Sequence, residues 1–231
     1  MHRLLFLIAS FLVILTSASA APKEKHFAFS TPQFKELRVQ DNVNVIYKVS
    51  TDSIARVSYT APEDFADSFI FTNSGGTLKI QVTTEDVGKT DLPTLYITSN
   101  HLERVHNYSD FNITIENTGT VPAFEATLIG NGMINVNLVK ADKIDARTTA
   151  GRGQIILQGE CRKANFRITG SGTINAAGLA IDDLDCKILG AGSIYCPTLK
   201  NLTVKGLGST KIYYPGNPKI KHSGGGKLIH Q

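Results

Sequence analysis

One short pattern recurs at nearly even intervals through the second half of the sequence: a glycine, a spacer, a second glycine and, two positions later, an aliphatic residue. It appears as GNGMI, GRGQI, GSGTI and GAGSI, and then less regularly as GLGST and GGGKL. The first glycines are Gly130, Gly151, Gly170, Gly190, Gly206 and Gly224, which lie 21, 19, 20, 16 and 18 residues apart. A period near 19 residues is the scale of one turn of a β-solenoid.

A second register supports the first. A polar pair followed by an apolar residue recurs, and the apolar members are Ile144, Ala164, Leu184, Leu202 and Ile220, spaced 20, 20, 18 and 18 residues apart. Strand alternation around the glycine pairs points aliphatic residues inward on both sides of each pair. The residues 144–151 break this register, because strict alignment would bury Arg147. We expect a bulge there that buries Ala146, Thr148 and Ala150 instead.

Glycine suits a corner that every coil must turn at the same place. It adopts positive φ without a Cβ clash, and it lets stacked backbones approach closely. We therefore expect corner glycines at Gly130, Gly132, Gly151, Gly153, Gly170, Gly172, Gly190, Gly192, Gly206 and Gly208. A phosphate-binding loop is the alternative for such a pair, but no helical pattern and no Lys-Ser/Thr sequence follows.

The sequence therefore predicts an all-β fold, a parallel β-helix with about 16–22 residues per coil. Twenty glycines, no tryptophan and many β-branched residues agree with strands and tight turns. A single domain is expected over residues 21–231, with irregular coils and loop excursions over 26–100 and regular coils over 101–231. In the excursions, PEDFADSF and TTEDVGKTDLP are acidic and turn-rich, which is typical of partner-binding loops.

The first twenty residues read as a signal peptide. Arg3 precedes the apolar run LLFLIASFLVIL, and Ala18-Ser19-Ala20 has the small-x-small form of a cleavage site. No later segment is long enough to span a bilayer as a helix. The expected location is the periplasm, the cell surface or the extracellular space. Removal of Arg3 leaves 23 basic against 20 acidic residues, a net charge of +3, which is too mild and scattered to favour nucleic acid as a partner.

Three cysteines, Cys161, Cys186 and Cys196, cannot all pair within one chain, although an exported protein could oxidise two of them. Their spacing matches no metal motif. Each falls on an inward position of the repeat, so we interpret them as small core residues. Whether any two form a disulfide stays open.

These repeats resemble the head GIN domain family of exported bacterial proteins, also described as auto-transporter adhesins. The resemblance runs from about Phe34 to Tyr214. It includes FKELRVQDNVNVIYK, GGTLKIQV and LYITSNHLERV, followed by the glycine pairs with their Gly-Ile-Asn character in GTINA and GMINV. The resemblance implies a right-handed parallel β-helix and supplies no catalytic residues. The sequence has no alternating segments of about 10 residues that would form a membrane barrel.

The best carboxylate cluster is Asp182, Asp183 and Asp185, which could bind calcium or act as an acid–base pair. Stacking of the repeats favours a structural interpretation. Asp142, Arg162, Asp182 and Lys200 fall in one column of alternating sign, as expected of a solvated edge with ion pairs between coils. His101 and His106, five residues apart, have poor spacing for a metal pair. Tyr213 and Tyr214 could stack on a sugar ring, although a role in covering the last coils is simpler.

The sequence favours a non-enzymatic exported module for adhesion or surface interaction, with a glycan or a host or envelope protein as partner. No catalytic residue, metal site or cofactor is assigned. One alternative is a carbohydrate-active enzyme, a lyase or hydrolase, with its acids at Asp182, Asp183 and Asp185. Another is a periplasmic scaffold that binds an envelope protein. The last coil, GGGKLIH, has no capping helix, so its open edge could pair with a second copy.

Overall fold

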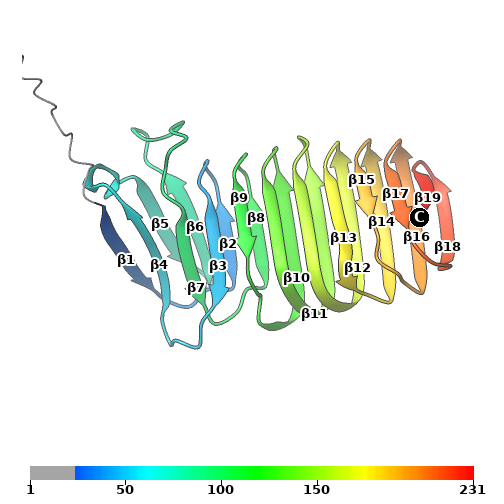
Figure 1. Ribbon diagram of the computed structural model, residues 1–231, viewed down its shortest axis with the longest axis horizontal. Helices are drawn as coiled ribbons and strands as arrows, with labels where there is room; N and C mark the ends of the chain where they lie inside the picture. Colours follow the sequence, from blue (N-terminus) through cyan, green and yellow to red (C-terminus); the bar gives the residue numbers. More distant parts are fainter. Residues whose placement is uncertain (1–23) are drawn as a thin grey trace, which may run out of the picture.

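A computed structural model describes residues 24–231, and the expected signal peptide lies outside the described residues. The described chain folds into a stack of coils along one long axis (Figure 1). Its strands form two faces, and the long strands β11 and β12 pass without interruption from the first face to the second. Among residues 24–231, no helix is long and apolar enough to cross a membrane.

The first face consists of parallel strands. In spatial order it contains β7 (Leu95–Ser99), β3 (Val45–Val49), β9 (Asn112–Ile115), the first parts of β11 (Met133–Thr149) and β12 (Gln154–Gly170), β13 (Thr173–Ala180), β15 (Ser193–Tyr195), β17 (Lys211–Tyr214) and β19 (Lys227–His230).

The second face is also parallel. It contains β6 (Thr77–Val82), β2 (Glu36–Val39), β8 (Arg104–Asn107), β10 (Thr120–Ile129), the second parts of β11 and β12, β14 (Asp183–Gly190), β16 (Asn201–Gly208) and β18 (Lys219–Gly224).

The aliphatic residues after the glycine corners stack in one buried row. Ile134, Ile155, Ile174, Ile194 and Ile212 pair in register from coil to coil, and each is fully buried. Because a single coil cannot bury its apolar side alone, this row is part of the core that holds the stack together. The parallel β-solenoid predicted from the sequence is confirmed.

The two glycines of each corner have different reasons to be glycine. Gly130, Gly151 and Gly170 have φ values of 121°, 69° and 113°, which residues with a Cβ rarely adopt. Gly192 has no positive φ, but a Cβ there would collide with the carbonyl oxygen of Gly172 in the preceding coil. Both predicted reasons, positive φ and close stacking, are confirmed at this corner.

The assignment of Gly206 as the first corner glycine of its coil is wrong. Gly208 pairs with Gly190 and is the corner residue, whereas Gly206 pairs with Ile188 inside the strand. Thr210 occupies the place of a second glycine and is fully buried, with its hydroxyl donating to the carbonyl oxygen of Gly190 at 3.0 Å. This coil is two residues shorter than the one before it, which hides the true register in the sequence.

The irregularity expected in residues 144–151 is only partly there. Ala146 and Thr148 are buried as predicted, but Ala150 is exposed in the corner with a φ of 61°. The strand keeps its register from Val139 to Thr149, and the shift lies earlier, between Val136 and Val139. The bulge expected within residues 144–151 is therefore absent, and the irregularity of β11 lies nearer its start.

The cysteines are core residues. Cys186 and Cys196 are buried, Cys161 is half-buried, and all three are free. Burial raises the pKa of the Cys161 thiol to about 11. A hydrogen bond with Cys196, together with burial, raises the pKa of Cys186 well above its ordinary value. Both thiols are thus protonated at neutral pH, which makes them poor nucleophiles.

Antiparallel strands cover the N-terminal end of the stack. Within residues 26–100, β1 (Lys25–Thr31) pairs with β4 (Ala55–Ala61), β4 pairs with β7, and β5 (Phe69–Ser74) pairs with β6, all antiparallel. Aromatic rings pack behind them, with Phe27 stacked on Tyr59 at 4.9 Å between ring centroids. A short 3-10 helix, Glu63–Phe65, lies between β4 and β5. The solenoid is therefore closed at this end by a change of strand direction.

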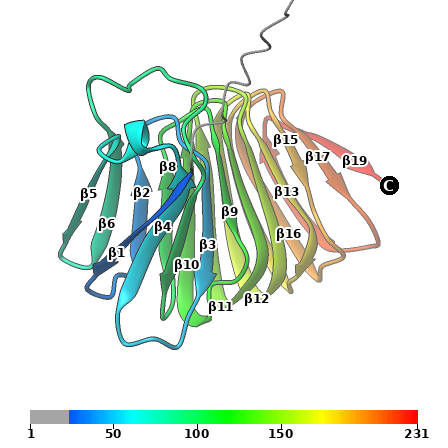
Figure 2. The same cartoon turned by 60° about the vertical axis from the view of Figure 1, so that its left-hand side comes forward.

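At the other end of the stack lie β18 and β19 (Figure 1), and Figure 2 shows β19 leading to the C-terminus at this end. They pair with β16 and β17, and no other strand of residues 24–231 pairs with their outer edges. All six residues of β18 are exposed. Association of two copies through this edge stays a prediction.

Candidate functional site

The outer side of the second face carries a row of cations. Because side chains alternate along a strand, every second residue of β11, β12, β14 and β16 points outward. Arg147 pairs in register with Arg167, Arg167 with Lys187, and Lys187 with Lys205. We call these four residues the basic column. Strand spacing places successive members about 4.8 Å apart at the backbone.

The acids beside the basic column have other partners. Asp145 pairs with Lys143 at 2.6 Å, and Asp185 pairs with Lys163 at 3.0 Å. Among residues 24–231, no acid lies within ion-pair distance of any member of the basic column. The Nε of Arg147 is buried and has no hydrogen-bond partner. The basic column is thus a line of positive charge without internal compensation.

Exposed leucines border the column at its C-terminal end. Leu189 and Leu207 pair in register two residues beyond Lys187 and Lys205, and their side chains are 60% and 69% exposed. A shallow hollow of about 380 Å³ lies over β12, β14 and β16. It is lined by Arg167, Thr169, Lys187, Ile188, Leu189, Lys205 and Gly206. Its floor is apolar and its rim carries three cations.

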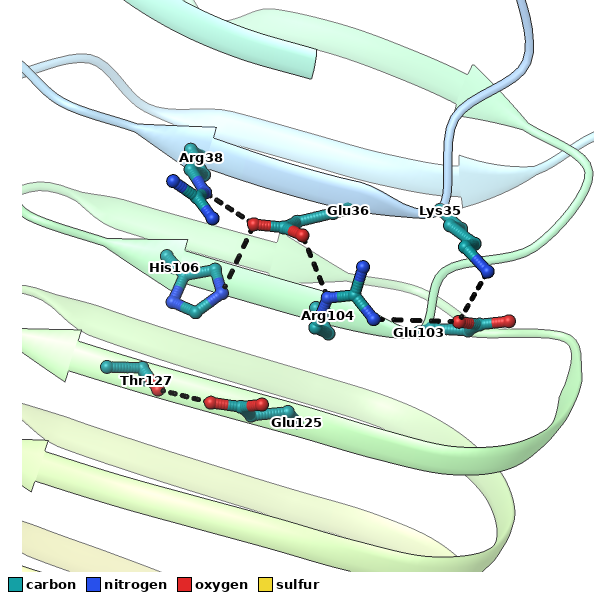
Figure 3. Close-up of polar contacts among 8 residues, drawn as sticks. All are labelled: Lys35, Glu36, Arg38, Glu103, Arg104, His106, Glu125 and Thr127. Atoms are coloured by element: carbon teal, nitrogen blue, oxygen red, sulfur yellow. Dashed lines mark hydrogen bonds and ion pairs between the residues drawn. The ribbon is translucent and has the colours of Figure 1, made fainter. Parts of the chain in front are cut away.

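The same outward row continues toward the N-terminal end, where an acid, Glu36, lies beside Arg38 and His106. It passes from Arg147 to Thr127, His106, Arg38 and Lys79. Figure 3 shows Glu36 at the centre of this region, between Arg38, Arg104 and His106. The carboxylate accepts a hydrogen bond from Arg38 Nε and another from Arg104 Nε at 2.8 Å, and His106 Nε2 lies 3.5 Å away.

Two pKa values shift in this cluster. Burial acts to raise the pKa of Glu36, but the hydrogen bonds and charges of Arg104 and Arg38 outweigh it, so the pKa is lowered from 4.5. Burial lowers the pKa of His106 from 6.5, and Arg38 and Arg104 add to this, against the opposing charges of Glu36 and Glu125. At neutral pH the cluster therefore holds a carboxylate between two guanidinium groups, beside a neutral imidazole.

The three aspartates singled out from the sequence are engaged separately. Asp182 pairs with Lys200 at 3.1 Å, Asp183 accepts a hydrogen bond from Asn201 Nδ2 at 2.6 Å, and Asp185 pairs with Lys163. Each partner belongs to a neighbouring coil. Within residues 24–231, no group of three or more His, Cys, Asp or Glu side chains could hold a metal ion.

The edge column predicted to alternate in sign lines an open groove of about 820 Å³. Asp142, Arg162 and Asp182 lie along it with Lys140, Glu160 and Cys161. The ion pair between Asp182 and Lys200 confirms part of the prediction, and Lys140 pairs with Glu160 at 3.3 Å. In the part of the chain that the structure describes, Arg162 forms no ion pair with either Asp142 or Asp182.

The remaining candidates lie apart from the basic column. Tyr213 stacks on Tyr195 at 4.7 Å between centroids with an interplanar angle of 5°, and Tyr214 meets His230 edge-on at 5.4 Å. Their packing matches a role in covering the last coils. His101 lies 3.6 Å from Glu103.

The two acidic excursions come together at the N-terminal end. Together they line an open hollow of about 810 Å³ that contains Glu63, Asp64, Asp67, Glu85, Asp86 and Lys89. The connection between β6 and β7 projects beyond the stack there (Figure 1). The excursions thus form one acidic surface at the opposite end from the exposed leucines.

The basic column was missed in the sequence although its signal is present. Its members lie three residues after Ile144, Ala164, Leu184 and Leu202, which are the apolar residues of the second register. Reading the outward positions in that register would have aligned four cations.

A family model with the description "Putative auto-transporter adhesin, head GIN domain" matches residues 33–218, most of the chain. The chain belongs to this family. The resemblance seen in the sequence is thereby confirmed. A search of curated proteins found no match.

Solved structures of similar shape include proteins of Bacteroides and Parabacteroides species. A "putative adhesin" from Bacteroides fragilis superposes with a TM-score of 0.78 at 20% identity, covering 91% of this chain and 96% of that one. A "putative adhesin" from Parabacteroides merdae gives 0.69 at 20% identity, with 90% and 95% covered. A "putative lipid binding protein" from Parabacteroides distasonis gives 0.68 at 20% identity, again with 90% and 95% covered. At these identities the likeness shows the shared fold alone.

Proposed function

We propose that this head GIN protein is an exported, non-enzymatic adhesion module that binds its ligand on the outer side of the second face. The observation that carries this proposal is the basic column, a row of uncompensated charge on a rigid surface. Binding sites are commonly recognised by exposed charge that the protein itself does not neutralise. The family description and the names of the similar structures support adhesion as the general role.

The engagement of the aspartates argues for binding over catalysis. A glycosidase needs two carboxyl groups that flank one bond, with one of them free to give a proton. Asp183 and Asp185 are instead held by Asn201 and Lys163 of neighbouring coils. A lyase or hydrolase built on Asp182, Asp183 and Asp185 therefore has less structural support than an adhesion module.

Binding of the purified protein to glycan arrays, to mucin and to intact bacterial and epithelial cells tests the proposal. Saturable binding on any of these surfaces is the expected result. Silence on all of them would overturn it. Release of unsaturated sugars or reducing ends from acidic polysaccharides would favour the enzyme instead. Specific capture of one envelope protein would favour the periplasmic scaffold.

A further inference from the structure

We infer that the basic column is a binding track for a single chain of an acidic polysaccharide, whose carboxylate groups contact Arg147, Arg167, Lys187 and Lys205 in succession. This inference rests on the proposed adhesive function and names its ligand class. It does not depend on the acidic loops at the N-terminal end, on the stacked Tyr195 and Tyr213, or on the groove beside Arg162.

The first argument is the cost of the arrangement. Like charges directly opposite each other on neighbouring strands destabilise a sheet. Three such contacts occur in a row along the column. Arg38 and Arg104, which lie on the same face, share an acidic partner in Glu36. A destabilising row that is kept on a well-packed scaffold is typical of a functional surface.

The second argument is that the column is prepared for an anion. Lys143 and Lys163 engage Asp145 and Asp185, so these acids are held away from the neighbouring cations. Arg147 keeps a buried Nε with no partner, although a guanidinium donates readily to a carboxylate. An incoming carboxylate would meet the part of the half-buried Arg147 guanidinium that reaches the surface, because the Nε itself is buried.

The third argument is width. The column is one residue wide, with Asp145 and Asp185 on one side and Leu189 and Leu207 on the other. An anionic membrane pressed flat against this face would place most of its head groups over the ion pairs of Asp145 and Asp185, which have no net charge to attract them. A single polymer chain running along the stack touches the cations and avoids the acids. The shape of the charge therefore favours a linear polyanion over a lipid surface.

The fourth argument concerns what lies beside the charge. Leu189, Leu207 and the apolar floor at Ile188 can pack against the C–H faces of sugar rings. Single-stranded nucleic acid needs aromatic platforms on which bases stack. The outward row that borders the column holds Thr149, Thr169, Leu189 and Leu207, with no aromatic residue. A saccharide thus fits this border better than a nucleobase.

Titration calorimetry with polygalacturonate at low salt tests the inference. We expect saturable binding that weakens as salt rises, because exposed ion pairs are screened. Fully methyl-esterified polygalacturonate has a matching backbone without the charges and should not bind. Arg167→Gln combined with Lys187→Gln should weaken binding about ten-fold, since two exposed charge contacts are lost.

A charge-matched control separates the column from net charge. Lys48→Gln combined with Lys211→Gln removes two cations from the first face and should change affinity less than two-fold. The Arg167→Gln, Lys187→Gln variant should also melt no lower than the wild type, because a repulsion has been removed. Equal loss of binding in both double variants would overturn the inference.

Two further probes test nucleic acid and an anionic membrane as alternative ligands. Stronger binding to oligo-dT, or to phosphatidylglycerol vesicles in a phosphatidylcholine background, would overturn the saccharide assignment in favour of nucleic acid or membrane. If the protein adheres to cells or mucin but binds no acidic polysaccharide, this inference fails and the adhesive function stands. If it does neither, both fail.

Discussion

Asp185 pairs with Lys163 of the preceding coil at 3.0 Å, and not with Lys187, which lies two residues along its own strand and points to the same side. This choice of partner leaves Lys187 uncompensated. The charge of the whole face depends on this choice. If Asp145 and Asp185 paired with members of the basic column, they would neutralise about half of its charge.

Replacement of Asp185 tests that relationship. Asp185→Asn removes a negative charge beside Lys187, so polygalacturonate should bind about two- to five-fold more tightly. Thermal unfolding should show a loss of at most about 1 kcal/mol, because the pair with Lys163 is partly exposed. Asp182→Asn, at the distant edge, serves as the matched control and should leave the affinity unchanged. Weaker binding by Asp185→Asn would contradict the role given to the column.

The corner glycines give a prediction about stability. Gly192→Ala should destabilise the protein by about 3 kcal/mol or more, because the new Cβ collides with the backbone of Gly172. Gly88 has a φ of 93° and open space around it. Gly88→Ala should therefore cost only about 1–2 kcal/mol of backbone strain. Chemical denaturation measures both, and equal losses would show that close stacking is not the reason for the second glycine.

Glu36 should matter for folding at acidic pH. Its pKa is lowered in the folded protein, so its stabilising contribution is present above pH 4.5 and is lost as pH falls through the lower native value. Glu36→Gln should cost about 2 kcal/mol at pH 7, since two guanidinium groups lose their buried acceptor. Glu160→Gln, in an exposed pair with Lys140, should cost less than about 1 kcal/mol. Urea titrations from pH 3 to pH 7 would compare them.

His106 should give a second pH dependence at higher pH. The groups that face it are Glu36, Glu125, Arg38 and Arg104, and its native pKa lies below 6.5. Since the unfolded chain binds the proton more readily, stability should be complete above pH 6.5 and should fall as pH drops below it. His106→Gln should flatten the stability curve in that window. An unchanged slope in His106→Gln would assign the effect to other groups.

Much of the fold could be predicted from spacing alone. A corner that every coil must turn leaves glycines at even intervals, and inward positions leave Ile155, Ile174 and Ile194 in a row. The antiparallel strands at the N-terminal end could not be predicted in this way. Strand direction depends on which edge a segment meets, and β1, β4 and β5 carry no repeat that would show it.

The candidate site shows the same division between what the sequence predicts and what the tertiary structure decides. The sequence by itself determined that the chain is a solenoid. Glycine pairs that recur about every 19 residues are typical of coils that turn the same corner and stack on one another. Only the tertiary structure decided which glycine turns the shortened coil, Gly206 or Gly208, and which acid compensates which cation. Those outcomes depend on the lateral register between coils, where a shift of two residues changes every neighbour on the face while leaving the buried row equally apolar.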